Sequence, residues 1–244
     1  WIESDKKEEV KAHNKIKKVI ELSPSSLDYQ INKCHRCFYL SKKLGIQTNN
    51  FPPPVFNQLD LLQKDFFIDK DTSFISEKLP KGRFLQDNEL PKKITSTLLK
   101  DNKGRDFKLV GIPDLVIGFE DKTYGIIDFK TTKISKKKAD FYKFQLEAYA
   151  QIFENPHEGP ELKPVSHLGL IQFTPDEIFD ADFENCKQKM KINYFPLTRN
   201  SDEFKKFITE KIDILESNKI PLKYEKCKIC NSADKYMEVM NNEK

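Results

Sequence analysis

Three charged side chains interrupt apolar segments near the middle of the 244-residue chain. Asp114 precedes Leu115-Val116-Ile117, and Asp128 and Lys130 flank Phe129. Side chains alternate along a strand, so Asp128 and Lys130 are expected on one face and Phe129 on the other. A hairpin that turns near residues 120–121 can bring Asp114 close to Asp128. Two converging carboxylates form a hard-oxygen site of the kind that Mg²⁺ prefers. A lysine beside them can orient or deprotonate a water, or stabilise charge that develops on a phosphate.

The alternative is that these side chains face solvent, as most charged residues in strands do. We favour the site, because Asp114 and Asp128 lie in runs apolar enough to be buried on both faces. An unpaired charge is costly there.

A second polar pair, Gln145 and Tyr149, follows on the next predicted helix, where a spacing of four places both on one face. The order Pro113-Asp114, Asp128-Phe129-Lys130, Gln145-x-x-x-Tyr149 resembles the PD-(D/E)XK nuclease superfamily. Its last element resembles the Gln-x-x-x-Tyr motif of the RecB-like branch. That branch includes nuclease domains of bacterial recombination helicase-nucleases and CRISPR-associated exonucleases.

The resemblance implies a restriction-endonuclease-like α/β core over about residues 52–175, with a central mixed sheet flanked by helices. It also implies that Asp114 and Asp128 bind a catalytic Mg²⁺ or Mn²⁺, together with the backbone carbonyl of Phe129. Lys130 would position or activate the attacking water, and Gln145 would orient Lys130 or the scissile phosphate. Tyr149 is a further candidate for the site, with a core aromatic as the alternative.

Family members usually add an acidic residue or a histidine from the first core helix, and no histidine falls in residues 55–67. Asp60 and Asp65 are the candidates. We favour Asp60 as the additional metal ligand, because it lies mid-helix between Leu59 and Leu61, whereas Asp65 is expected on a solvated face.

Two Cys-x-x-Cys pairs lie far apart in the sequence, Cys34/Cys37 and Cys227/Cys230. A four-cysteine site would join the N- and C-terminal flanks, residues 22–51 and 220–244, around the core. Such sites hold Zn²⁺ or an iron–sulfur cluster. RecB-like relatives often carry a 4Fe–4S cluster with one cysteine plus three, so the two-plus-two division here leaves zinc open. The alternative is four unrelated buried thiols. His35 is a less favoured candidate for a substitute ligand, and Cys186 is expected to be a free thiol.

Four lysines, Lys133, Lys136, Lys137 and Lys138, follow the predicted catalytic strand directly. A basic run beside a metal site suits contact with a phosphate backbone, and a solvated loop is the equally weighted alternative. Nothing in the run indicates base-specific readout.

The surrounding pattern supplies the elements that must position these residues. Ser23-Pro24 predicts the start of a helix that runs through Cys34. Apolar periodicity predicts helices over 55–67, from about 136 to Pro156, and over 202–216. Strands are expected over residues 94–99, 107–119, 122–131, 167–173 and 191–197. Thr174-Pro175-Asp176 is expected to end the strand over 167–173. The order predicts an α/β fold.

Composition narrows the remaining choices. Lysine and arginine number 42 against 38 acidic residues, a balance too mild to demonstrate a nucleic-acid partner and no argument against one. No apolar run is long enough for a membrane span, and the polar start does not look like a secretory signal. Paired cysteines without such a signal favour a reducing, cytoplasmic location. We expect residues 1–21 to form a polar tail or helix and residues 22–244 to form a single nuclease domain.

These observations favour a divalent-metal-dependent DNA nuclease that acts in repair, recombination or defence on single-stranded DNA or duplex ends. A helicase or another repair or defence subunit is a candidate partner. The alternative is a non-catalytic module that binds DNA or a helicase and retains a structural four-cysteine metal site.

Overall fold

The structure is a computed structural model that describes residues 19–27, 33–46, 53–68, 70–86 and 88–242. The strands are β1 (Ile20–Leu22), β2 (Gly82–Phe84), β3 (Ile94–Thr95), β4 (Leu99–Lys100), β5 (Asp106–Gly111), β6 (Leu115–Phe119), β7 (Tyr124–Thr131), β8 (Val165–Ala181) and β9 (Cys186–Leu197). The α-helices are α2 (His35–Leu44), α3 (Pro54–Ile68), α4 (Lys136–Ala139), α5 (Lys143–Glu154), α6 (Ser201–Glu216) and α7 (Lys228–Asn242). Short 3-10 turns are η1 (Pro24–Leu27), η2 (Thr72–Phe74) and η3 (Asp140–Tyr142).

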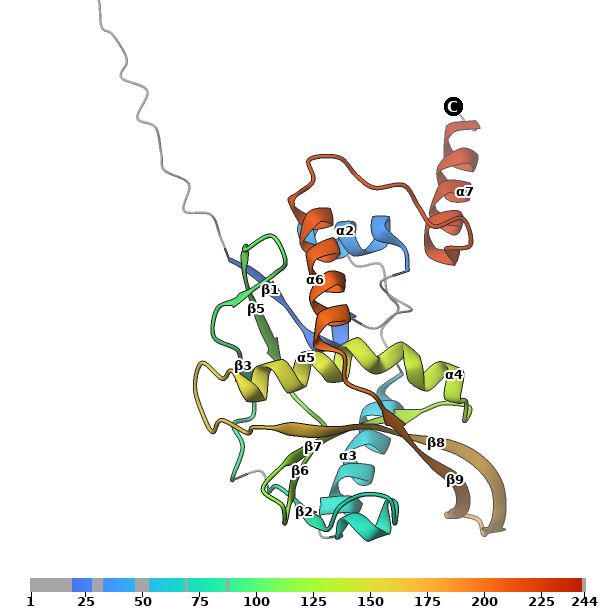
Figure 1. Ribbon diagram of the computed structural model, residues 1–244. Coiled ribbons are helices and arrows are strands. Elements are labelled where there is room, and N and C mark those ends of the chain that lie inside the picture. The colour runs from blue at the N-terminus through green and yellow to red at the C-terminus, as the bar shows by residue number, and fades with distance from the viewer. Residues whose placement is uncertain (1–18, 28–32, 47–52, 69, 87, 243–244) are drawn as a thin grey trace, which may run out of the picture.

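The main sheet has the order β2-β6-β7-β8-β9. Its β7–β8 pair is parallel and its other pairs are antiparallel, so the sheet is mixed. Strand β7 lies at its centre. A smaller sheet forms around β5, which pairs with β1, β3 and β4. Figure 1 shows α5 and α6 on one side of the main sheet and α3 on the other.

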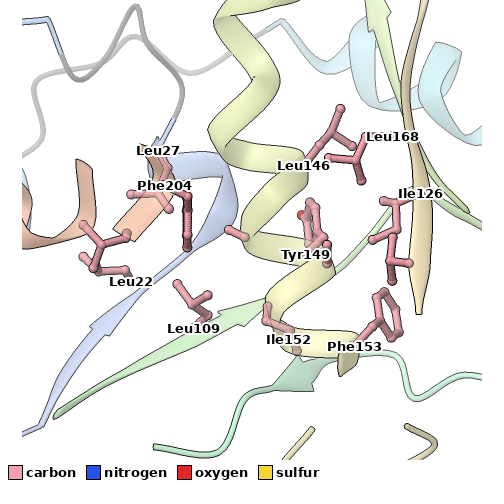
Figure 2. Close-up of a cluster of buried hydrophobic side chains, with 14 of the residues drawn as sticks. Leu22, Leu27, Leu109, Ile126, Leu146, Tyr149, Ile152, Phe153, Leu168 and Phe204 are labelled. Atoms are coloured by element: carbon pink, nitrogen blue, oxygen red, sulfur yellow. The ribbon is translucent and has the colours of Figure 1, made fainter. Parts of the chain in front are cut away.

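Two hydrophobic clusters cover the two faces of the main sheet. The larger cluster joins α5 to both sheets and to α6, through residues such as Leu109, Ile126, Leu146 and Phe204 (Figure 2). The second cluster packs Phe67 of α3 against residues of the opposite face, Ile117, Phe129 and Ile171. The predicted α/β class with a mixed sheet between helices is therefore confirmed.

The strand predicted over 107–119 is wrong, because it is two strands in two different sheets. Strand β5 ends at Gly111 and β6 begins at Leu115. Pro113 has no backbone N–H to give to a sheet, and the chain crosses between the sheets at this point. Asp114 therefore lies in a break immediately before a strand rather than inside one.

The first cysteine pair also differs from its predicted position. Ser23-Pro24 opens only the short turn η1, and residues 28–32 lie outside the described part of the chain. A separate helix, α2, begins directly after Cys34, which has an extended backbone with φ −104° and ψ 103°. The pair thus lies at the start of a helix, not at the end of one.

Several boundaries shift as well. Strand β8 continues past residues 174–176 to Ala181 and forms a long exposed hairpin with β9. Residues 1–18 of the expected tail or helix lie outside the described residues, whereas Ile20 and Glu21 belong to strand β1. The helix predicted over 55–67 is present, but Val55, Leu62 and Phe66 of its apolar stripe are exposed. Among the described residues, no helix has the length and apolar character that a membrane span requires.

Candidate active site

Strand β7 carries the centre of the site. It is paired on both sides, and the alternation of its side chains places Ile127 and Phe129 in the cluster under α3. Asp128 and Lys130 therefore face α5, as predicted from their spacing. The Asp128 side chain is almost completely buried, with 3% of its surface exposed.

Antiparallel pairing brings Asp114 to Asp128. Leu115 of β6 pairs with Ile127 of β7, so the break that contains Asp114 lies beside Asp128. The Phe129 backbone N–H donates to Asp114 Oδ2 at 2.9 Å, which fixes this carboxylate against β7. The hairpin expected near residues 120–121 produces this approach.

Lys130 completes the predicted triad. Its Nζ forms a close ion pair with Asp128 Oδ2 and donates to the Phe129 carbonyl oxygen at 3.1 Å. The ammonium also lies 5.1 Å from the centre of the Tyr142 ring. The two predicted carboxylates, the predicted lysine and the carbonyl of Phe129 thus meet in one place.

The two carboxylates have different proton affinities. Burial, together with the negative charge of Asp114, raises the pKa of Asp128 to about 7 against the attraction of Lys130. Burial also opposes ionisation of Asp114. The positive charges of Lys130 and Lys64, with hydrogen bonds from Lys64 and the Phe129 N–H, outweigh it and lower the pKa of Asp114. As the pH rises, Asp114 therefore loses its proton before Asp128 does.

Gln145 and Tyr149 of α5 support the site in different ways. Gln145 Nε2 donates to Asp128 Oδ1 at 2.8 Å from a buried position. Tyr149 packs in the core cluster (Figure 2), and its hydroxyl donates to the Ile112 carbonyl at 2.6 Å. Tyr149 thus holds the backbone two residues before Asp114 from a position in the core, and its role in the site stays a prediction.

Asp60 reaches the site through a residue that the sequence analysis did not identify. Lys64 Nζ lies 2.8 Å from Asp60 Oδ2 and 2.8 Å from Asp114 Oδ1. Asp65 of the same helix is exposed. The spacing of Asp60 and Lys64 by one helical turn could have indicated an ion pair on this helix. An ordinary surface pair has the same spacing, so the sequence does not distinguish the two.

The chemistry of these groups suits a divalent metal. Asp128 Oδ2 is buried and, apart from its ion pair with Lys130, accepts no hydrogen bond in the described structure. The donor set is carboxylate and carbonyl oxygen, which Mg²⁺ and Mn²⁺ prefer. Asp114 and Asp128 would hold the ion, whereas Asp60 contacts Asp114 only through Lys64.

The predicted lysine run follows the C-terminal end of β7. Backbone N–H groups of the loop after β7 donate to β8, from Ile134 to Thr174 Oγ1 at 3.0 Å and from Ser135 to Gln172 Oε1 at 2.7 Å. These bonds fix the start of α4. Lys133, Lys136 and Lys137 are exposed, whereas Lys138 is half-buried and donates to Thr132 Oγ1 at 3.2 Å.

The four paired cysteines meet in a separate cluster. Their sulfur atoms all lie within 4.8 Å of one another, and the closest pair, Cys37 and Cys230, is 3.4 Å apart. These distances exclude disulfides, whose sulfurs are about 2 Å apart. The Tyr224 backbone N–H points at Cys34 Sγ at 3.4 Å. Burial alone would raise the pKa of the Cys34 thiol. Hydrogen bonds from the backbone and from the neighbouring thiols outweigh burial and lower this pKa to about 7. A four-cysteine group able to hold a metal is therefore confirmed, whereas Cys186 is exposed and His35 pairs instead with Glu210 at 2.9 Å.

Comparison with known proteins agrees with this geometry. The family model of the PD-(D/E)XK nuclease superfamily matches residues 77–234, which include Asp114, Asp128, Lys130, Gln145 and Tyr149. No curated protein matches the chain. The solved structure of SSO0001 is similar with a TM-score of 0.47 and 17% identity, over 83% of this chain and 80% of that one.

Proposed function

The chain belongs to the PD-(D/E)XK nuclease superfamily, and on this premise we propose that it is a divalent-metal-dependent DNA nuclease. The observation that carries the proposal is the convergence of Asp114, Asp128 and Lys130 around a buried carboxylate oxygen, Asp128 Oδ2, that is paired with the Lys130 ammonium. The superfamily consists generally of nucleases that use divalent metals, so the proposal adds the substrate and the residue roles. The metal would supply Lewis-acid stabilisation of charge on the phosphate.

The protein residues would then act around the bound ion. Lys130 Nζ, held at Asp128 and the Phe129 carbonyl, would orient the attacking water and stabilise the charge that develops on the phosphate. Gln145 would keep Asp128 in its binding orientation. The exposed lysines of the loop and α4, Lys133, Lys136 and Lys137, would bind backbone phosphates near the cut.

A nuclease assay tests this proposal. End-labelled single-stranded DNA, duplex DNA and RNA are incubated with Mg²⁺, Mn²⁺ or EDTA. We expect metal-dependent DNA cleavage that Asp128→Asn and Lys130→Met each reduce by about 10³-fold or more, because both remove charge at the reacting centre. Asp65→Asn, a change of an exposed acid on α3, serves as the matched control and should cleave like the wild type. Absence of cleavage by intact wild-type protein would favour the non-catalytic binding module, and preferential cleavage of RNA would replace DNA as the substrate.

We further propose that the chain belongs to the RecB-like branch and that it acts in DNA repair, recombination or defence. The contact between Gln145 and Asp128 supports this assignment, because Gln145 belongs to the Gln-x-x-x-Tyr motif that is typical of the branch. The expected helicase or other repair or defence partner remains a prediction.

We also propose that the cysteine cluster holds one tetrahedral Zn²⁺ rather than a 4Fe–4S cluster. A tetrahedral ion with metal–sulfur bonds of about 2.3 Å sets its sulfurs about 3.8 Å apart. Three pairs here measure 3.4, 3.5 and 3.7 Å. A cubane would occupy the space between the sulfurs and force them much farther apart. Metal analysis of protein purified without oxygen is expected to find one zinc per chain and no absorbance near 400 nm; stoichiometric iron and sulfide would contradict this.

A further inference from the structure

We infer that Lys64 is a phosphate-binding residue that the catalytic metal releases from Asp114. The inference rests on the proposed function, because it takes Asp114 as a metal ligand. Lys64 projects from α3, whereas Lys130 belongs to β7. Its ammonium lies 2.8 Å from Asp114 Oδ1 and 2.8 Å from Asp60 Oδ2.

The position of Lys64 conflicts with a metal on Asp114. Asp114 Oδ2 accepts the hydrogen bond of the Phe129 N–H, so an ion that binds Oδ1 disturbs the backbone contact least. Mg²⁺ binds carboxylate oxygen at about 2.1 Å, so an ion on Oδ1 would lie a few ångströms from the Lys64 ammonium. Two cations at this separation repel each other strongly in a partly buried site. Metal binding therefore expels the ammonium from Asp114.

A groove beside the site provides the place where the released ammonium can act. It has a volume of about 330 Å³ and is lined by Lys64, Asp114, Lys92 and aliphatic side chains such as Leu85 and Ile112. Lys64 is one-quarter exposed, whereas Lys92 lies on the exposed rim. Asp114 is the only acidic residue that lines this groove among the described residues, and a metal on Asp114 neutralises it. The groove is then positively charged and fits the sugar–phosphate unit next to the cut.

This arrangement couples the metal to the substrate. Without the ion, Lys64 neutralises Asp60 and Asp114. With the ion, the same lysine keeps Asp60 as its acidic partner and can turn its other N–H groups to a phosphate of DNA that enters the groove. A lysine whose role is only structural would also compete with the metal for Asp114, but its removal would leave the salt dependence of DNA binding unchanged.

Metal binding in the absence of DNA tests the competition directly. Binding of Mn²⁺ to the full chain is measured by electron paramagnetic resonance for the wild type, Lys64→Met, Lys64→Arg, Lys92→Met and Asp114→Asn. We expect Lys64→Met to bind Mn²⁺ about tenfold more tightly, because the competing charge is gone. Lys64→Arg retains the competing charge and should stay within about twofold of the wild type. Lys92→Met removes an equal charge from the same groove without contact to Asp114, and its effect should be much smaller.

DNA binding tests the contact between Lys64 and a phosphate separately from metal binding. With Ca²⁺ in place of Mg²⁺, DNA affinity is measured against salt concentration. Lys64→Met should reduce the slope of log affinity against log salt by about one, the value for one lost phosphate contact. Unchanged or weaker Mn²⁺ binding by Lys64→Met, or an unchanged salt slope, would overturn the inference. If Lys64→Met does not fold, Lys64→Gln, which can still donate to Asp60, gives the same comparison.

Asp114→Asn separates the two levels of the argument. Loss of Mn²⁺ binding in this variant supports the metal site, so a failure of Lys64→Met to bind more tightly would then count against Lys64 alone. Wild-type Mn²⁺ binding by Asp114→Asn would instead remove the proposed metal site, and the role of Lys64 with it.

Discussion

Burial determines the chemical character of the central residues. Asp128 is surrounded by protein and has two stabilising partners, Lys130 on one oxygen and Gln145 on the other. Asp114 is held by the Phe129 N–H and by Lys64. Each carboxylate therefore has its own cation and its own neutral donor, which keeps two acidic groups together in a poorly solvated place. A divalent ion would take over the role that the two ammonium groups have here.

Gln145 is expected to matter for activity more than for folding. Gln145→Ala removes the hydrogen bond to Asp128 Oδ1 and leaves that oxygen free to turn away from the metal. We expect DNA cleavage to fall by about 10- to 100-fold and the free energy of unfolding to fall by only about 1–2 kcal/mol. Steady-state cleavage and urea denaturation measure the two effects. Gln151→Ala, one of whose partners is Glu147 on the same helix, is the control, and equal activity losses in both variants would contradict the assignment.

At the scale of elements, regular segments were more predictable than their junctions. Strands β6 and β7 and helices α5 and α6 follow clear hydrophobic periods, and the alternation along β7 correctly placed Asp128 and Lys130 on one face. The break at residues 112–114 was missed because its neighbours are as apolar as a strand. Helix α2 was missed as a separate element because Cys34 is not a usual N-cap residue. Contacts between distant segments, such as Lys64 with Asp114, have no signature in a single sequence.

Gly111 is expected to be required for the approach of α5 to this break. A Cβ at this position would lie 2.8 Å from Pro24 Cδ and 2.9 Å from Tyr149 Cε1, closer than carbon atoms pack. Gly111→Ala should therefore lower the free energy of unfolding by about 1–3 kcal/mol through overpacking. It should also reduce cleavage, because Tyr149 would lose its hold on the backbone before Asp114. Combination with Tyr149→Ala, which removes the contact with the ring but leaves the contact with Pro24, should add less destabilisation than the sum of both single changes. Strict additivity would contradict the contact with Tyr149.

At the scale of the whole molecule, charged networks join segments that the sheets leave separate. Arg199, between β9 and α6, pairs with Glu147 and Glu154 of α5, each at 2.8 Å. It also donates to the Val165 carbonyl of β8 at 2.6 Å. Burial alone would raise the pKa of Glu147, but hydrogen bonds from Arg199, Gln151 and Ser201 and the charge of Arg199 lower it below its ordinary value of 4.5. The network is therefore a source of pH-dependent stability.

Arg199→Met is expected to destabilise the protein by about 3–5 kcal/mol at pH 7, because it leaves buried carboxylates without their cation. The lowered pKa of Glu147 means that its contribution is complete above about pH 4.5 and is lost as the pH falls through the lower native pKa. The difference between wild type and variant should thus shrink below pH 4.5, where the carboxylates of both proteins take up protons. Urea denaturation at pH 7, 5 and 4 measures this, and a difference that stays constant over the range would contradict the electrostatic origin.

The cysteine cluster is the main attachment of the C-terminal helix to the rest of the described structure. Figure 1 shows α7 beside α2 and apart from the sheets, and Cys230 is the buried residue of this helix. Beyond the cysteines, Arg36 contributes a hydrogen bond to the Pro221 carbonyl at 3.3 Å and a longer ion pair to Asp234. Exposed polar contacts of this kind contribute little stability. We therefore expect a metal bound by the four cysteines to supply most of the energy that holds the flank in place.

Removal of the metal is accordingly expected to release α7 and leave the nuclease core folded. A zinc-selective chelator, or Cys227→Ser, should make the segment between α6 and α7, residues 217–227, sensitive to limited proteolysis. The core should retain its main unfolding transition, because the two hydrophobic clusters on the faces of the main sheet include no cysteine ligand. Cys186→Ser changes an exposed thiol outside the cluster and should leave the digestion pattern as in the wild type. Complete unfolding on chelation would instead mean that the two flanks and the core form one cooperative unit, whereas continued resistance of residues 217–227 would mean that the contacts with α2 suffice without a metal.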